Sequence, residues 1–533
     1  MKIPIACKYG PRSVTRYTTE MGIKLVMQVF YCCYMAQVAN AAHYYTAAVY
    51  EHHVLLNHNS KALSNRTFAL EFMAKNLDIY EQQVGAAAER GVEIIVFPED
   101  GIHGFNYSRA SIFPFLDYLP PPALLPWNPC VEQKRFQDTE VLQRLSCMAM
   151  KSDMFVVANL GTKRPCDPVD PQCPPDERYQ FNTDIVFSDT GALIASYFKH
   201  NLYFEFSFDT PPEVQYAVFD TPFGRCGLLT CFDILFYEPT VSLIEKHQVN
   251  HLLYPTAWMN QLPLLSSIQI QRAFATRFSV NLLAANIHHT TLGMTGSGIF
   301  SPSNSSYHYD MDTEHGHLIV AKVPVNPSKE MGPGHDEKVS LKYGDPLETS
   351  HFLTSAQVCD KMDKTEHCME AGENRQETLF HATMMYDNFT FIPLEDNDGK
   401  VHVCAGSLCC YLTYRKHNVS NELYSLGVFD GLHTVHGTYS LQICALVKCG
   451  GLDMETCGQE VTDANSTITF QLWGRFSTMH IYPMIVTSGV TLHLPDHWGW
   501  KDQNCYMNKT GLELGLVTAA LYGRYYERDN TLR

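Results

Sequence analysis

Basic residues are scarce in this chain of 533 residues, which has 39 Lys and Arg against 56 Asp and Glu and a formal net charge of −17. Nucleic acids and anionic membranes are bound by clustered Lys and Arg, which neutralise phosphates. The sequence contains no such cluster. We therefore expect neither nucleic acid nor an anionic membrane as a partner.

Long apolar runs are also rare. Leu25 to Ala36 is mostly apolar, follows Lys24 and precedes Ala39-Asn40-Ala41, which is the layout of a secretory signal peptide cleaved after about Ala41. A membrane anchor is the alternative, but the run is shorter than the roughly 20 apolar residues that span a bilayer. The charged end Tyr526 to Arg533 is unlike a hydrophobic lipid-anchor signal. The sequence thus predicts a leader over residues 1–41 and a secreted, extracellular protein without a membrane anchor.

Glycosylation motifs agree with secretion. Asn-x-Ser/Thr acceptors stand at Asn65, Asn106, Asn304, Asn388, Asn418, Asn465 and Asn508. Each motif alone is weak, but seven along the mature chain indicate a glycoprotein.

The 18 cysteines fit an oxidising compartment. Cys7, Cys32 and Cys33 lie in the leader and leave an odd number, so at least one thiol stays unpaired. Plausible local pairs are Cys130 with Cys147, Cys166 with Cys173, and Cys359 with Cys368. Six more form either three disulfides in any of 15 arrangements or, as the competing interpretation, a zinc cluster: Cys404, Cys409, Cys410, Cys444, Cys449 and Cys457. This leaves Cys226, Cys231 and Cys505.

Length and patterning indicate at least two domains. Residues 42–325 alternate helical and strand-like segments, which predicts an α/β domain. Helices are expected from Leu70 to Gly91 and over Thr139–Met150, Thr240–Lys246 and Ser266–Phe278. Residues 326–377 are polar and irregular and read as a linker or insert. Residues 378–533 alternate apolar and polar side chains, which predicts a smaller β-rich domain that packs against the first and shapes or protects its pocket.

Three reactive side chains stand at boundaries of predicted strands. Glu99 follows the run Val92–Phe97, Lys199 follows Ala192–Tyr197, and Cys231 follows Cys226–Thr230. In α/β domains reactive groups gather at strand ends. Taken singly, Glu99 and Lys199 are ordinary surface charges, and Asp100 and His200 are adjacent alternatives.

This trio indicates amide hydrolysis through a thioester. An amide has a weakly electrophilic carbonyl and an amine that leaves only when protonated. Its hydrolysis therefore needs a thiol nucleophile, a group that transfers protons and a fixed cation. A free thiol has a pKa of about 8.5, so it needs a base beside it to take its proton or a cation to stabilise the thiolate. Cys231 is the candidate nucleophile, Glu99 the candidate proton acceptor and donor, and Lys199 the candidate cation. No cofactor and no metal is expected.

Three segments carry a family resemblance. Phe97-Pro98-Glu99-Asp100, Lys199-His200-Asn201-Leu202 and Thr230-Cys231-Phe232-Asp233 resemble the Glu, Lys and Cys signatures of the nitrilase superfamily. Other stretches resemble its secreted branch, the vanins and biotinidases: Tyr45–His52, Gly101–Asn106, Arg178–Thr183, Pro255–Leu265, Met294–Gly298 and Gly431–Tyr439. Cys226 and Cys505 depart from the family pattern. The resemblance implies an αββα sandwich followed by a β-rich domain.

The resemblance to the biotinidase side of this branch also implies a substrate. We expect cleavage of biotin amides, such as biocytin and biotinyl peptides, to biotin and lysine, with biotinyl transfer to other amines chemically allowed. The Phe232 backbone amide would assist Lys199 in stabilising the oxyanion. The candidate contacts for biotin are Tyr254, Trp258 and Phe206. Asn201 or Asn286 would bind its ureido group. Alternatives are a pantetheinase, which needs the same trio, and a biotin carrier without catalysis. A monomer is expected.

Overall fold

The computed structural model describes residues 43–121, 127–329, 378–418 and 420–529. The expected leader over residues 1–41 lies outside these ranges. So does most of the expected linker, with Cys359 and Cys368.

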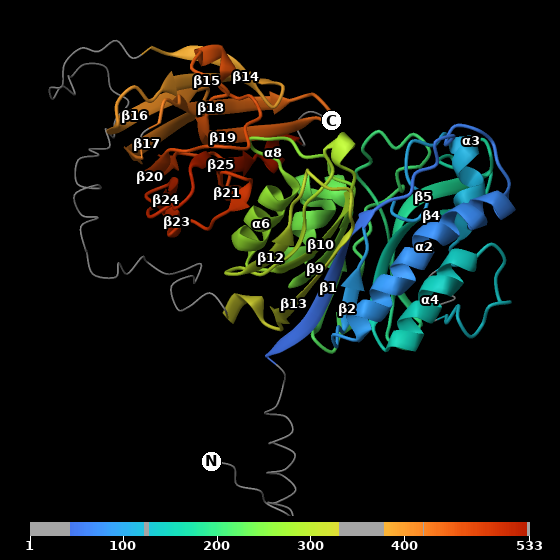
Figure 1. Ribbon diagram of the computed structural model, residues 1–533. Coiled ribbons are helices and arrows are strands. Elements are labelled where there is room, and N and C mark those ends of the chain that lie inside the picture. The colour runs from blue at the N-terminus through green and yellow to red at the C-terminus, as the bar shows by residue number, and fades with distance from the viewer. Residues whose placement is uncertain (1–42, 122–126, 330–377, 419, 530–533) are drawn as a thin grey trace, which may run out of the picture. The chain divides into compact units, whose positions relative to one another are not determined.

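Two β-sheets pack face to face in the first half of the chain (Figure 1). The first has the order β6-β5-β4-β2-β1, with β13 antiparallel to β1. Its strands are β1 (Tyr44–His53), β2 (Ile94–Val96), β3 (Asp117–Tyr118), β4 (Phe155–Pro165), β5 (Arg178–Phe187), β6 (Leu193–Phe198) and β13 (His317–Pro324). The second contains β7 (Val218–Thr221), β8 (Gly224–Leu228), β9 (His251–Thr256), β10 (Asn281–His288), β11 (Ser297–Phe300) and β12 (Ser305–His308). Buried Val49, Val157, Leu228 and Leu283 belong to the core between the sheets.

Helices cover the outer face of each sheet. The helices α2 (Arg66–Ala88) and α4 (Glu140–Ser152) share a core with the first sheet, and α5 (Ser242–Glu245) and α6 (Ser267–Phe278) share one with the second. The layers are therefore αββα, as the family resemblance implied. The shorter helical segments are α3 (Arg109–Ile112), η1 (Phe113–Phe115), η3 (Cys231–Leu235), η4 (Tyr237–Val241), η5 (Thr290–Leu292), η6 (Pro327–Lys329), η7 (Met454–Thr456) and α8 (Tyr526–Asp529).

Side-chain caps explain where two helices begin. The Asn65 side chain accepts a hydrogen bond from the Phe68 backbone amide, so α2 begins one turn before the apolar periodicity becomes visible. Ser266 and Gln269 form a capping box at the start of α6. The strand expected over Cys226–Thr230 is shifted: β8 ends at Leu228, because Thr230 is already the N-cap of the next helical turn and its backbone amide donates to the Asp233 carboxylate.

Residues 378–529 fold into two further antiparallel sheets. The larger has the order β14-β15-β18-β19-β25-β21-β22, and the smaller β16-β17-β20-β24-β23. The strands are β14 (Phe380–Met384), β15 (Asp387–Pro393), β16 (Asp398–Ala405), β17 (Leu408–His417), β18 (Tyr424–His433), β19 (Tyr439–Lys448), β20 (Thr467–Gly474), β21 (Ile481–Thr487), β22 (Thr491–Leu492), β23 (His497–Lys501), β24 (Asn504–Lys509) and β25 (Leu516–Arg524). One core lies between these sheets, and the larger sheet also packs on α6, where the rings of Phe274 and Tyr482 are 5.9 Å apart.

The disulfides confirm the local pairs that lie in the described residues. Cys130 pairs with Cys147 and Cys166 with Cys173. The last six cysteines form Cys404–Cys409, Cys410–Cys444 and Cys449–Cys457, so the zinc interpretation was wrong. Cys226, Cys231 and Cys505 are free and buried.

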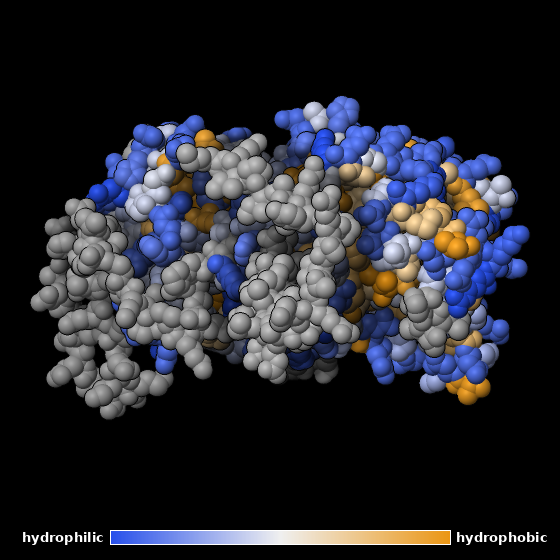
Figure 2. All heavy atoms as spheres, turned by 90° about the horizontal axis from the view of Figure 1, so that it is seen from below, coloured by the Kyte–Doolittle hydropathy of each residue, from blue (hydrophilic) through white to orange (hydrophobic). Residues whose placement is uncertain are grey.

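The surface is accessible at the glycosylation motifs. Six of the seven asparagines are exposed and Asn508 is half-buried. Among the described residues no helix is long and apolar enough to cross a membrane. On the face drawn in Figure 2, hydrophobic residues form small groups between hydrophilic ones.

Candidate active site

A sharp turn after β8 presents the candidate nucleophile. Cys231 begins η3 and has φ of +44°, a left-handed conformation that is rare outside glycine. Hydrogen bonds hold this turn: the Tyr254 hydroxyl donates to the Cys231 carbonyl over 2.7 Å, and Asp233 accepts from the Tyr197 hydroxyl over 2.7 Å. The surrounding structure thus fixes the thiol at a strained position.

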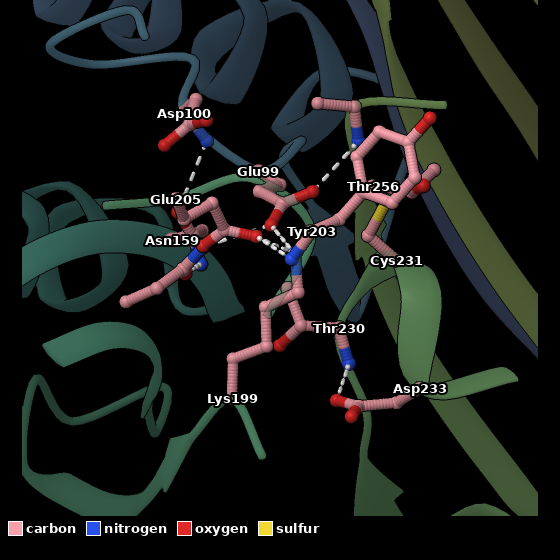
Figure 3. A network of polar contacts seen from close by, with 12 residues as sticks. Glu99, Asp100, Asn159, Lys199, Tyr203, Glu205, Thr230, Cys231, Asp233 and Thr256 are labelled. Atoms are coloured by element: carbon pink, nitrogen blue, oxygen red, sulfur yellow. Dashed lines mark hydrogen bonds and ion pairs between the residues drawn. The ribbon is translucent and has the colours of Figure 1, made fainter. Parts of the chain in front are cut away.

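Glu99 and Lys199 meet beside this turn (Figure 3). The Lys199 ammonium donates to Glu99 Oε1 over 2.6 Å, and the Asn182 side chain donates to the same oxygen over 2.8 Å. The Ala257 backbone amide donates to Glu99 Oε2 over 3.0 Å. Cys231 interacts electrostatically with both charged groups. The structure therefore brings together the three residues that the sequence placed at separate strand boundaries.

Sequence reasoning missed a second carboxylate, that of Glu205. It accepts a close hydrogen bond from the Lys199 ammonium, and one from the Asn182 side chain over 2.7 Å. Glu205 lies in the loop after β6, six residues beyond Lys199, and no strand boundary marks it. The only available signal was an acidic residue at short range from Lys199.

Burial and charge set the protonation states. Burial and the Glu99 carboxylate raise the pKa of Cys231 well above its usual value, although Lys199 opposes them. Burial alone would lower the pKa of Lys199, but Glu205 and Glu99 raise it well above its usual value. The resting site therefore holds a neutral thiol and a charged lysine, and the thiol has to lose its proton during attack.

Asp100 and His200, the adjacent alternatives to Glu99 and Lys199, have other partners. The Lys199 ammonium pairs with Glu99 and Glu205, while the Asp100 carboxylate lies 3.9 Å from the ring of His103. Burial and Glu99 raise the pKa of Asp100 well above its usual value. The His200 backbone amide donates to the Tyr197 hydroxyl. Glu99 is thus the carboxylate held between Lys199 and the backbone of Ala257.

The candidate biotin contacts are scattered. Tyr254 is fully buried and bonds the nucleophile turn, and the Trp258 indole donates to the Leu265 carbonyl over 3.0 Å. Phe206 is 82% exposed. The side-chain amides of Asn201 and Asn286 bond protein oxygens. Contact with biotin by these residues stays a prediction.

The loop between β18 and β19 of the C-terminal domain also reaches the site; the sequence analysis expected this domain to shape or protect the pocket but indicated no residues for that role. A Cβ added at Gly437 would lie 2.7 Å from the ring of Phe232, the residue after the nucleophile. The ring of His436 is 6.1 Å from that of Tyr203, which is 5.1 Å from that of Phe232. Residues 436 and 437 thus line the same region as the loop that carries Glu205.

One cluster has metal-ligand residue types. Ligand atoms of Glu51, His288 and His308 lie within 4.8 Å of one another. However, both ring nitrogens of His288 face acceptors, Glu51 Oε1 at 2.7 Å and the Thr313 carbonyl at 2.5 Å. Burial would lower the pKa of His288, but Glu51 and Thr313 raise it. An imidazolium paired with a carboxylate explains this cluster.

The comparisons with known proteins agree with this geometry. The Carbon-nitrogen hydrolase family model matches residues 69–314, and the Vanin C-terminal domain model matches residues 378–529. Biotinidase from Mus musculus is 57% identical, over 92% of this chain and 95% of its own. Biotinidase from Homo sapiens is 52% identical over 98% of each, and pantetheinase from Homo sapiens is 39% identical over 96% of this chain and 94% of its own.

The fold and these matches define a carbon–nitrogen hydrolase, an enzyme that cleaves amide bonds. Within that class, the chain belongs to the biotinidase and vanin branch of the nitrilase superfamily.

Proposed function

We propose that this protein hydrolyses biotin amides, such as biocytin and biotinyl peptides, to biotin and a free amine. The observation that supports amide hydrolysis is the contact of Lys199 with Glu99 beside the unpaired Cys231. The biotinyl group is favoured because two relatives named biotinidase are 52% and 57% identical to this chain, against 39% for a pantetheinase.

In the first half-reaction, Glu99 accepts the Cys231 proton while the sulfur attacks the amide carbon. The Lys199 ammonium and the Phe232 backbone amide stabilise the oxyanion. Such donors typically contribute about 10² to 10³ in rate each. Glu99 then gives its proton to the amine nitrogen, the C–N bond breaks, and a biotinyl thioester remains on Cys231.

In the second half-reaction, Glu99 takes a proton from water, which attacks the thioester carbon. The C–S bond breaks, the thiolate takes back the proton from Glu99, and biotin leaves. Glu205 acts on Lys199 in both halves: its hydrogen bond with the ammonium and the shared Asn182 contact keep the ammonium beside Glu99. Glu205 is therefore a positioning residue.

The remaining expectations belong to the same proposal. Five disulfides among the described residues suit secretion into an oxidising compartment. We propose a leader over residues 1–41, a catalytic domain over 42–325, a linker over 326–377 and a β-rich domain over 378–533. We also propose that the seven asparagine motifs carry glycans and that the protein is a monomer.

Adduct mass spectrometry tests the function. The protein is incubated separately with biocytin and with pantetheine, quenched in acid, and the peptide containing Cys231 is weighed. We expect a biotinyl adduct on Cys231 together with release of biotin and lysine. A pantothenoyl adduct with release of cysteamine would make the protein a pantetheinase. Retention of biotin without any adduct would make it a carrier.

A further inference from the structure

A line of aromatic side chains leads from the nucleophile to solvent. Tyr203 interacts electrostatically with Cys231, and burial, then Cys231 and Tyr386, raise the pKa of Tyr203 to about 12. Cys231 is 6% exposed, Tyr203 is half-buried, and the next rings, Tyr386 and Phe204, are 54% and 59% exposed. Tyr203 thus joins the buried thiol to an accessible aromatic surface, and Figure 3 draws its ring near the sulfur.

His436 joins the two halves of this surface. Its exposed ring meets three others edge-on: Tyr203 at 6.1 Å, Phe204 at 5.5 Å and Tyr386 at 5.2 Å between ring centroids. Tyr203 and Phe204 come from the loop that carries Glu205. Tyr386 and His436 come from two C-terminal loops, between β14 and β15 and between β18 and β19. Neither part of the chain makes this surface alone.

The backbone is strained where these rings stand. Phe204 has φ of +55°, Tyr386 of +71° and His436 of +60°, all in the left-handed region. Such conformations are unfavourable for residues with a side chain and cluster at ligand sites, where the surrounding structure enforces them. A buried pair, His433 Nδ1 with Asp387 Oδ2 at 2.7 Å, ties the two C-terminal loops together next to Tyr386 and His436.

The order of the reaction assigns one half of the substrate to this surface. The acyl group stays on Cys231 through both half-reactions, whereas the amine has to leave before water attacks. The amine therefore needs a path that opens to solvent, and the aromatic line from Tyr203 outward is such a path. Aromatic faces bind alkyl chains and, within about 6 Å, alkylammonium ions.

We propose that Tyr203, Phe204, Tyr386 and His436 form the subsite for the leaving amine, and that it takes an aliphatic amine carrying a cationic head, such as the lysyl part of a biotinyl-lysine. This proposal rests on the proposed function, which identifies the acyl group of the substrate as biotinyl. The C-terminal domain thereby selects the amine.

The experiment compares two amides of one acyl group. Biocytin carries the lysyl amine, and biotin methylamide carries an amine too short to reach the subsite. Both give the same thioester, so deacylation is common to them. The variants are His436→Gly and Tyr386→Asn, because glycine and asparagine tolerate a left-handed φ and remove the ring without adding backbone strain, whereas asparagine at position 436 would create an Asn-Gly-Thr glycosylation motif. His402→Asn is the matched control, an exposed histidine in β16 whose ring stacks on Tyr411.

For each variant we expect kcat/KM for biocytin to fall about tenfold, as for loss of one aromatic or cation–π contact. The value for biotin methylamide and the deacylation rate constant should stay within about twofold of the parent enzyme. Equal losses on both amides, or no loss on biocytin, would overturn the subsite.

Failure of the proposed function gives a different result, because the parent enzyme would then release biotin from neither amide. In that case Nε-pantothenoyl-lysine and pantothenic acid methylamide serve as the pair, because they keep the lysyl amine and change only the acyl group, and the same selective loss is required.

Discussion

The Arg524 guanidinium, at the end of β25, donates a hydrogen bond over 2.7 Å to the carbonyl of Leu235, the last residue of the turn that Cys231 begins. Arg524 is fully buried, and its other nitrogens bond the Ser440 carbonyl and the Asp529 carboxylate, both over 2.5 Å. The C-terminal sheet thus anchors the far end of the nucleophile turn.

Replacing Arg524 by lysine should impair catalysis. An ammonium cannot reproduce the planar set of bonds to three oxygens, so the turn would lose its anchor at Leu235. We expect kcat to fall about tenfold with KM little changed, because the thiol is misplaced and substrate contacts remain. Steady-state kinetics and single-turnover acylation measure this effect. Arg528→Lys, which alters the ion pair with Asp430, is the control. A lower melting temperature with unchanged kcat would mean that Arg524 only stabilises the fold.

Removing the candidate nucleophile should abolish turnover. Cys231→Ala should lower kcat by about 10⁴-fold or more, because the residues of a nucleophilic site act as a unit. Cys226→Ala and Cys505→Ala are matched controls: both thiols are buried in apolar cores, and burial raises the pKa of each to about 12. Retained activity in Cys231→Ala, or loss in either control, would reassign the nucleophile.

Glu205 should control the acid side of the pH profile. Burial raises its pKa above the usual value even though Lys199 opposes the shift. As the pH falls, Glu205 therefore takes up a proton at a higher pH than an ordinary carboxylate and weakens its hold on Lys199. We expect Glu205→Gln to lower kcat/KM about 10²-fold and to move the acid limb to lower pH.

A profile of kcat/KM against pH measures this shift, with exposed Glu213→Gln as the control. An acid limb that stays in place in Glu205→Gln would show that another group titrates there.

His103 should make the fold sensitive to acid. Its Nε2 accepts from the Gly161 backbone amide over 2.8 Å and its Nδ1 donates to the Gly104 carbonyl, so the buried ring is neutral. Burial lowers its pKa from 6.5 to about 4. The unfolded chain therefore binds a proton near pH 6.5 that the folded chain binds only near pH 4, and stability present above pH 6.5 is lost between these values.

Thermal melting between pH 7 and pH 4 measures this loss, for which the difference in pKa predicts a few kcal/mol from His103 at about 1.4 kcal/mol per unit. His103→Gln should be less stable at pH 7 but show a shallower decline. A decline as steep as in the parent protein would assign the sensitivity to other groups.

Helical and strand periodicities differ, so the sequence predicted an α/β domain, while the αββα order of layers came from the family resemblance. The sequence also predicted the local disulfides because their cysteines are few residues apart. Boundaries were less certain. The helix expected over 240–246 is a π-type turn over Tyr237–Val241 followed by α5, because a backbone hydrogen-bond pattern decides this and apolar spacing does not reveal it. Pairing of the last six cysteines required the register of β16, β17 and β19.

The linear order of residues determined which chemistry is available: a thiol, a carboxylate and an ammonium, each placed where a strand stops, and therefore each delivered to a loop. Only the tertiary structure decided that Glu205 shares Lys199 with Glu99, and that Arg524, Gly437 and His436 reach the nucleophile turn from the C-terminal sheets. Except for the contact of Glu205 with Lys199, these contacts join residues far apart in the chain, and long-range contacts depend on how sheets pack, which local patterns do not encode.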